Sequence, residues 1–265
     1  MGIMELIKTR RSFRTFDGRT LSNERQQKLL ELIRENNNPY DIPVEFVLLD
    51  AKEHGLSSPV IQGEHLYIAA KVPKVLHCEE AFGYSFEKMV LDAWSIGIGT
   101  TWIGGTMNRE LFENAVHLKE NERMFCISPL GYPAKKQSLK EMAMRKGVQA
   151  DKRIPDTELF FEGHFSNPLH TKDKTILNAL EAVRIAPSAV NKQPWRIVKM
   201  GNDFHFYEKH TLGGRSGAEW DVQKIDMGIA LYHFMAVTNG QFSLADPKIE
   251  IPKDTEYIAT VILTL

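Results

Sequence analysis

The sequence predicts an α+β protein built from two similar halves. Segments with apolar residues at helical spacing alternate with short runs rich in β-branched residues, as expected for helices and strands in turn. The order recurs in the second half of the 265-residue chain: PVEFV and PWRIV begin 151 residues apart, at 43 and 194, and Gly83 and Gly228 lie 145 apart. Nearly equal offsets indicate a degenerate internal duplication, with chance alignment of helix–loop–strand patterns as the alternative.

The first half is expected to contain two helices and two strands. Ser22 can cap the first helix, because its hydroxyl accepts from an amide that the helix leaves unpaired. That helix ends at the turn-forming sequence ENNNP, residues 35–39. The elements expected after it are a buried strand at 44–50, a helix at 84–94 that glycines terminate, and a strand at 123–134 that runs into a turn.

The second half repeats this order after a polar, basic segment. Residues 135–155 lack a core face, so we expect a first half at 1–134, a basic connector at 135–170 and a second half at 171–265. The elements expected in the second half are a helix at 175–186 that Pro187 stops, a hairpin at 194–208 that turns near Gly201 and Asn202, a helix at 226–238 and a strand at 257–265.

Composition favours a small-molecule ligand over a macromolecule. The 33 basic and 34 acidic side chains nearly cancel, so no overall field attracts nucleic acid or an anionic membrane. Neither a signal-peptide core nor an apolar stretch of the roughly 20 residues that span a bilayer occurs, which favours a cytoplasmic protein. The two cysteines lack CxxC spacing and the nine histidines are scattered, so we assign neither a disulfide framework nor a metal site.

Two short motifs in the first half could bind an anion and a flat ligand. Residues 9–17, TRRSFRTFD, surround one hydroxyl with three guanidinium groups, those of Arg10, Arg11 and Arg14 around Ser12. The alternative for these arginines is a solvated face. Residues 102–106, WIGGT, contain two adjacent glycines, where a backbone can approach a flat ligand closely; an ordinary turn is the alternative.

A third motif lies in the second half. Residues 186–195, APSAVNKQPW, offer the polar side chains of Ser188, Asn191 and Gln193 just after a helix end, and Trp195 begins the following strand. Serine and asparagine also form turns by bonding their own backbone, which is the structural alternative.

Together these motifs resemble the nitroreductase family of FMN-dependent oxidoreductases. The matching stretches are RRSFRTF at 10–16, GIGTTWIGG at 97–105, LGYPA at 130–134 and APSAVNKQPWRI at 186–197. The resemblance implies a nitroreductase-like α+β fold with mixed, mostly antiparallel sheets and central helices. One departure is the order: ordinary members carry the APS element soon after the arginine element, near residues 35–45 here, where this sequence reads ENNNPYDIPVE.

The resemblance also explains this order. Ordinary members are homodimers with FMN at the interface, where one subunit gives the arginine element and glycine pair and the other gives the PSxxN element. Here the first half keeps RRSFR and WIGG, and the second keeps PSAVN. The chain therefore resembles a fused pseudo-dimer with a single FMN site. Such a chain can be a monomer, because it supplies both half-motifs itself, and the second, pseudo-symmetric site should not bind FMN.

Roles for individual residues follow from the resemblance. Arg14 would reach the pyrimidine side of the flavin and tune it, and the flavin N5, rather than a side chain, would carry the chemistry. Lys152 and Arg153 are the best match to the basic group that binds the FMN phosphate, with Arg145 as a competitor. The other expected FMN-binding residues are Arg10, Arg11, Ser12, the backbone of Ile103, Gly104 and Gly105 with an N–H toward N5, Pro187, Ser188, Asn191 and Gln193.

The implied function is an FMN-dependent NAD(P)H oxidoreductase that reduces nitroaromatics, quinones or similar electron-poor acceptors by ping-pong hydride transfer. NADH and NADPH both remain open as donors, because the sequence has no Rossmann fingerprint. The alternative is a flavin-binding or ligand-sensing module with little turnover, in which an insertion at 53–75 or the basic connector caps the flavin and blocks hydride donors. A helical interaction protein without cofactor is disfavoured by the combined motifs.

Overall fold

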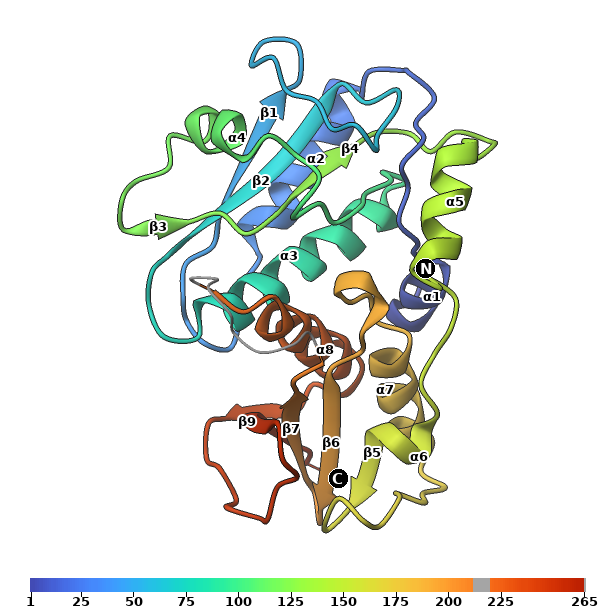
Figure 1. The fold of residues 1–265 in the computed structure, drawn as a ribbon, viewed down its shortest axis with the longest axis vertical. Helices are drawn as coiled ribbons and strands as arrows, with labels where there is room; N and C mark the ends of the chain where they lie inside the picture. Colours follow the sequence, from blue (N-terminus) through green and yellow to red (C-terminus); the bar gives the residue numbers. More distant parts are fainter. Residues whose placement is uncertain (212–219, 265) are drawn as a thin grey trace. The chain divides into compact units, whose positions relative to one another are not determined.

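The computed structural model describes residues 1–211 and 220–264 (Figure 1). Two compact units make up the chain: unit 1 comprises Met1 and Thr9–Val148, and unit 2 comprises Gly2–Lys8 and Gln149–Leu265. The division between them falls inside the segment expected to connect two halves. In that segment, α5 (Leu139–Gly147) belongs to unit 1, whereas α6 (Asp156–Leu159) and β5 (Phe160–Glu162) belong to unit 2.

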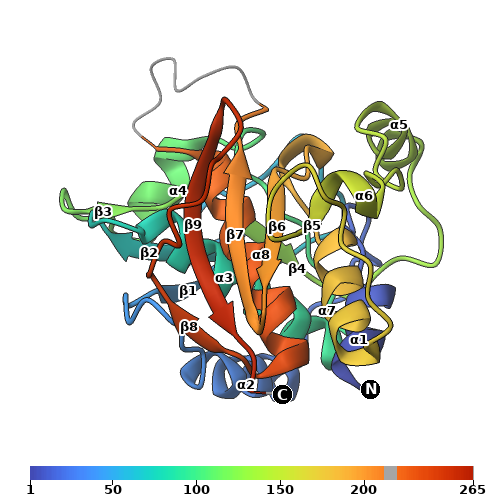
Figure 2. The same ribbon diagram turned by 90° about the horizontal axis from the view of Figure 1, so that it is seen from below.

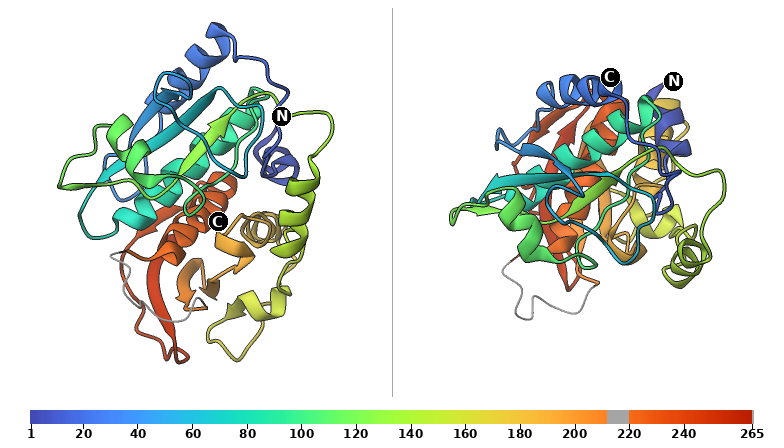
Figure 3. Two further views of the ribbon diagram at one scale, coloured as in Figure 1. Left: turned by 45° about the horizontal axis from the view of Figure 1, so that its top comes forward. Right: turned by 90° about the horizontal axis from the view of Figure 1, so that it is seen from above.

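Unit 1 is built around strand β2 (Leu66–Pro73). It pairs antiparallel with β1 on one side and with β3 and β4 on the other. Helix α3 packs on β2, and α2 packs on α3 (Figure 3). The remaining elements of unit 1 are α2 (Asn23–Arg34), β1 (Glu45–Asp50), α3 (Cys78–Ser95), α4 (Arg109–Ala115), β3 (Glu122–Arg123) and β4 (Ile127–Leu130).

Local sequence signals predicted some of the helix and strand boundaries in unit 1. Ser22 caps α2 as predicted, accepting a hydrogen bond from the Arg25 amide. Helix α3 is longer than predicted, because it begins at Cys78 rather than at residue 84. The preceding His77 has a left-handed backbone and makes no side-chain capping bond, and 12 of the 18 helix residues are buried. Neither a cap nor a clear polar face marked this start in the sequence.

The expectation that residues 53–75 form an insertion is wrong. Residues 66–73 are β2, the central strand of the unit 1 sheet, and Tyr67, Ile68, Ala69 and Ala70 are fully buried. A strand bonded on both edges cannot swing over a ligand as a cap. This removes residues 66–73 from the segment that could have blocked a hydride donor.

Unit 2 contains a five-stranded sheet in the order β5-β6-β7-β9-β8, whose strands β5, β6, β7 and β9 lie side by side in Figure 2. Only β5 and β6 run parallel; the other pairs are antiparallel. Helix α8 packs on β6 and β7, and α7 packs on α8. The elements are α1 (Ile3–Thr9), α7 (Lys174–Arg184), the 3-10 turn η1 (Ala189–Asn191), β6 (Trp195–Met200), β7 (Asp203–Lys209), α8 (Val222–Thr238), β8 (Gln241–Ser243) and β9 (Thr255–Ile262).

The predicted hairpin of the second half is confirmed. Met200 pairs with Asp203 across the turn, and Gly201 has a positive φ of 60°, which a glycine adopts without strain. Helix α8 begins four residues before the predicted 226, at a cap formed by Asp221. The predicted C-terminal strand is β9; residue 265 lies outside the described residues.

Both units share one order of elements, which confirms the α+β class with mostly antiparallel sheets and central helices. The shared elements follow the order α2-β1-β2-α3-β4 in unit 1 and α7-β6-β7-α8-β9 in unit 2. Unit 1 adds α4 and β3 between α3 and β4, and unit 2 adds β8 between α8 and β9. The second strand of each set pairs antiparallel with the first and the last, as β2 does with β1 and β4 and β7 does with β6 and β9. The long helices α3 and α8 occupy the same place in this order. In the described part of the chain, none of the helices has the length and apolar character needed to cross a bilayer.

Candidate functional site

The expected flavin-binding residues are distributed over both units of the chain. Unit 1 holds the arginine element, residues 10–16, and the glycine pair, Gly104 and Gly105. Unit 2 holds the loop at 187–193, called here the PSAVN loop, together with Lys152 and Arg153.

Two buried phenylalanines anchor the arginine element in unit 1. Phe13 and Phe16 are each 5% exposed and pack in the unit 1 core. The backbone of the element pairs with neighbouring segments: the Phe13 amide donates to Thr100 O at 2.9 Å, and the Phe16 amide donates to Gln62 O at 2.8 Å. A Cβ atom on Gly99 would lie 3.0 Å from the Phe13 ring, so the absent side chain allows this close approach. The apolar positions of the motif therefore hold the arginines beside the GIGTTWIGG segment.

Arg10 has a buried, positively charged side chain whose Nε makes no hydrogen bond with the described residues. Its side chain is 8% exposed, and Nε lies 3.8 Å from Oε1 of Glu87, a fully buried carboxylate on α3. Trp102 Nε1 donates to the other oxygen of Glu87 at 2.9 Å. Among the described residues, Arg10 Nε has no hydrogen-bond acceptor. Burial lowers the pKa of Arg10, Glu87 opposes this shift, and the charge of Arg145 adds to it.

Glu141 ties helix α5 to the arginine element. This carboxylate is 2% exposed and accepts from the Arg14 amide at 3.3 Å and from Thr15 Oγ1 at 2.8 Å. Arg145 follows it one helical turn later. Burial lowers the pKa of the Arg14 guanidinium; Glu141 raises it and Arg145 lowers it further. Arg10, Arg14 and Arg145 thus share one region of unit 1 with the carboxylates of Glu87 and Glu141, and the positive charge left over favours an anionic ligand.

The glycine pair leaves backbone exposed in unit 1. Gly104 and Gly105 are exposed, and a Cβ on Gly105 would meet nothing within 4 Å. The amide of Ile103, by contrast, donates to Ile127 O at 2.9 Å, and Ile103 O accepts from the Ile127 amide. Since the Ile103 amide is used in this pairing, an N–H for a flavin would have to come from Gly104 or Gly105.

In unit 2 the PSAVN loop is bonded to residues 149–154. Asn191 Nδ2 donates to Gln149 O at 2.7 Å and to Lys152 O at 3.0 Å. Gln193 Oε1 accepts from the Ile154 amide at 2.9 Å, and Ser188 Oγ accepts from the Gln193 amide at 2.9 Å. Ser188, Asn191 and Gln193 are therefore held by hydrogen bonds within unit 2, as also expected if they serve only to form a turn.

Arg153 and Lys152 have different surroundings. The Arg153 guanidinium donates to Ala150 O at 2.8 Å, to Lys152 O at 2.9 Å and to Asn191 Oδ1 at 3.3 Å, so it braces the PSAVN loop. Lys152 is exposed.

The sequence analysis did not identify Glu87 or Glu141. Ser138 and Glu141 do form an S-x-x-E capping pattern, which gives the only local signal for Glu141.

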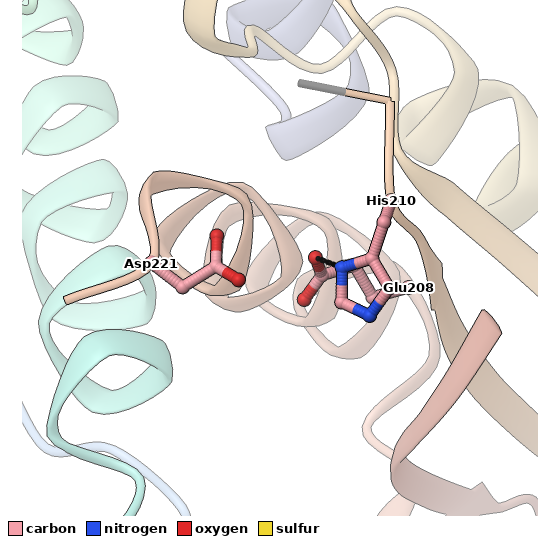
Figure 4. Close-up of side chains that lie close together, drawn as sticks. All are labelled: Glu208, His210 and Asp221. Carbon is pink, nitrogen blue, oxygen red and sulfur yellow. Dashed lines mark ion pairs between the residues drawn. The ribbon is translucent and has the colours of Figure 1, made fainter. Parts of the chain in front are cut away.

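A separate polar cluster lies at the start of α8 (Figure 4). One ligand atom each from Glu208, His210 and Asp221 lie within 4.8 Å of one another, close enough to hold a metal ion. Each group already has a protein partner: His210 Nδ1 is 2.7 Å from Glu208 and Nε2 is 3.7 Å from Glu256, and Asp221 accepts from the Gln223 amide at 2.9 Å. These contacts explain the cluster as an ion-pair and capping network.

The chain belongs to the family described as "Putative TM nitroreductase", whose sequence profile matches residues 2–238. Among solved structures, it is similar to a "putative nitroreductase" from Thermotoga maritima, with 21% identity, 99% of this chain and 94% of that chain covered, and a TM-score of 0.63. It is also similar to an "oxidoreductase containing FMN", with 13% identity, 63% and 93% covered, and a TM-score of 0.50. At these identities the likeness shows the fold. No curated protein matches the chain.

Proposed function

We propose that this protein is an FMN-dependent NAD(P)H oxidoreductase that reduces electron-poor acceptors such as nitroaromatics and quinones. The observation that carries the proposal is the buried Arg10 guanidinium, whose Nε has no acceptor among the described residues and which shares its region with Arg14 and Arg145. A buried donor without an acceptor is costly, and an anionic ligand would satisfy it. The nitroreductase family and the FMN of one structural relative support flavin as that ligand.

The residues present fit FMN in charge and in hydrogen-bonding character. Bound FMN would supply the hydride-transfer chemistry between NAD(P)H and the acceptor. Arg10, Arg11 and Ser12 would hold its ribityl and phosphate region, and Arg14 would stabilise negative charge on the pyrimidine side. Gly104 or Gly105 would offer a backbone N–H to the ring. The flavin-binding residues that we propose in unit 2 are Pro187, Ser188, Asn191 and Gln193.

We further propose one FMN site per chain. The shared order of elements in the two units supports an origin by duplication. Residues 35–45 of unit 1, where an ordinary member would carry the PSxxN element, use their amides internally: Asn36 Nδ2 donates to Ser85 O at 2.7 Å, and Asn38 Nδ2 donates to Ile42 O at 2.7 Å and to Ser85 Oγ at 3.2 Å. These residues read ENNNPYDIPVE and contain no PSxxN pattern, so a second, pseudo-symmetric site would lack that element.

The test of this proposal is the visible spectrum of the purified protein after incubation with FMN and desalting. We expect a retained flavin band, about one FMN per chain, that bleaches under anaerobic NADPH or NADH and recovers with a quinone. Two flavins per chain would contradict the single site. A retained band that neither donor bleaches would favour a binding module, and loss of all flavin on desalting would refute the proposal.

Arg145 is our preferred phosphate ligand over Lys152, because Arg145 acts electrostatically on both Arg10 and Arg14. Arg145→Gln should weaken FMN binding about tenfold, the equivalent of about 1.4 kcal/mol, and leave riboflavin binding unchanged, since riboflavin lacks the phosphate. Lys152→Gln is the matched variant. Should Lys152→Gln rather than Arg145→Gln lose the preference for FMN over riboflavin, the phosphate role belongs to Lys152. Arg153→Gln should weaken both ligands, because it loosens the loop.

A further inference from the structure

We propose that Asp226, a buried carboxylate on α8, is the positioning residue of the PSAVN loop, holding the loop in the conformation that binds flavin. The inference rests on the proposed function, because the loop is assigned to flavin there. It adds a residue that lies 37 positions after Ala189 and outside the motif.

The contact is a single amide held by both carboxylate oxygens. The Ala189 amide lies 3.0 Å from Oδ1 and 3.1 Å from Oδ2 of Asp226, and Asp226 is 2% exposed. Ala189 directly follows Ser188, so this bond fixes the peptide group that joins Ser188 to the rest of the loop. It also ties the beginning of the loop to a long helix of the unit 2 core.

The loop needs such an anchor because its backbone is strained. The backbone φ is positive at Val190, Asn191 and Gln193, with values of 43°, 59° and 51°. Residues other than glycine adopt this left-handed conformation only at a cost in free energy. Strained conformations of this kind persist only where surrounding bonds over-determine them, and they cluster at ligand sites. Residues 149–154 bond the end of the loop through Asn191 and Gln193, and Asp226 bonds its beginning.

The burial of Asp226 indicates that its contact with the loop is not incidental. Burial raises the pKa of Asp226 well above its usual range, the Ala189 amide opposes this shift, and the charges of Glu208 and Asp221 add to it. An apolar residue at this place in α8 would avoid the cost of burying a carboxyl group. The carboxyl group offsets this cost by accepting a hydrogen bond from the Ala189 amide of the loop.

The experiment compares FMN dissociation constants, measured by flavin fluorescence, among Asp226→Ala, Asp226→Asn and wild type. Asp226→Ala should weaken FMN binding about tenfold, whereas Asp226→Asn should stay within about threefold, because an amide oxygen can still accept from Ala189. His233→Ala is the matched control: His233 is a fully buried polar residue on α8, about two helical turns after Asp226, and its Nδ1 lies 2.8 Å from Ala182 O. It should lower the melting temperature and leave the FMN dissociation constant within twofold.

Three outcomes would overturn the inference: unchanged FMN affinity in a folded Asp226→Ala variant, failure of Asp226→Asn to restore affinity, or an equal loss in His233→Ala. Hydrogen exchange gives a readout without flavin or variant, because the Ala189 amide should be strongly protected in the wild-type apoprotein; exchange at the rate of an exposed amide would also overturn it. If the wild type itself binds no FMN, the proposed function fails, and protection of Ala189 still tests the anchor.

Discussion

Arg14→Ala is expected to lower the reduction potential of bound FMN and to weaken FMN binding by about thirtyfold, or about 2 kcal/mol, the scale of a lost charged hydrogen bond. Reduction places negative charge on the pyrimidine side of the flavin, where a fixed guanidinium stabilises it best if water is excluded. Burial already lowers the pKa of Arg14, so its positive charge is poorly solvated and available to a ligand. A dye-equilibration titration under anaerobic conditions measures the potential.

Arg34→Ala is the control for this variant. Arg34 is an exposed arginine in the last turn of α2, so the same loss of charge occurs on the surface of unit 1. The potential should be unchanged in Arg34→Ala and partly restored in Arg14→Lys. A well-folded Arg14→Ala protein with the wild-type potential would remove Arg14 from the tuning role.

Gly63→Ala should lower the free energy of unfolding by about 3 kcal/mol, the sum of left-handed strain and overpacking. Gly63 has a φ of 80°, and an added Cβ would lie 2.5 Å from Phe16 O and 3.0 Å from Phe16 C. These are backbone atoms, and the neighbouring Gln62 O accepts from the Phe16 amide, so neither segment can move away cheaply. The clash displaces the end of the arginine element, and FMN affinity should fall as well.

Gly55→Ala separates the two contributions. Gly55 also has a positive φ, 63°, but a Cβ there would meet nothing within 4 Å. Only the left-handed strain of about 1 kcal/mol should remain, with FMN affinity unchanged. Urea denaturation of both variants gives the comparison. Equal destabilisation of Gly55→Ala and Gly63→Ala would show that the approach of Gly63 to Phe16 contributes nothing.

The fold could be predicted wherever a signal was local. The Ser22 cap, the turn at Gly201 and the run of apolar residues in β9 each act within a few residues, so their elements were recognised. The failure at 66–73 has an equally physical cause. A central strand buried on both faces shows a continuous apolar run without alternation, and this run did not distinguish a strand from an inserted segment.

The candidate site shows the same limit at longer range. The residue types that contact the ligand in the proposal could be found from motifs, because these arginine, glycine and asparagine residues stand close together in short stretches of the sequence. Their supports come from elsewhere: Glu141 lies 127 residues from Arg14, and Glu87 reaches Arg10 from the middle of α3. A lone glutamate on a helix carries no signal of its partner, apart from the capping pattern at Ser138.

By itself, therefore, the sequence determined the α+β class, the main elements of the second half and the residue types of the arginine element and the PSAVN loop, since hydrophobic period, caps and turns act locally. Only the tertiary structure decided that β2 is a central strand, that the Ile103 amide is used by Ile127, and that Asp226 holds Ala189. Burial and hydrogen bonding between distant segments set these features, and no pattern of neighbouring residues encodes them.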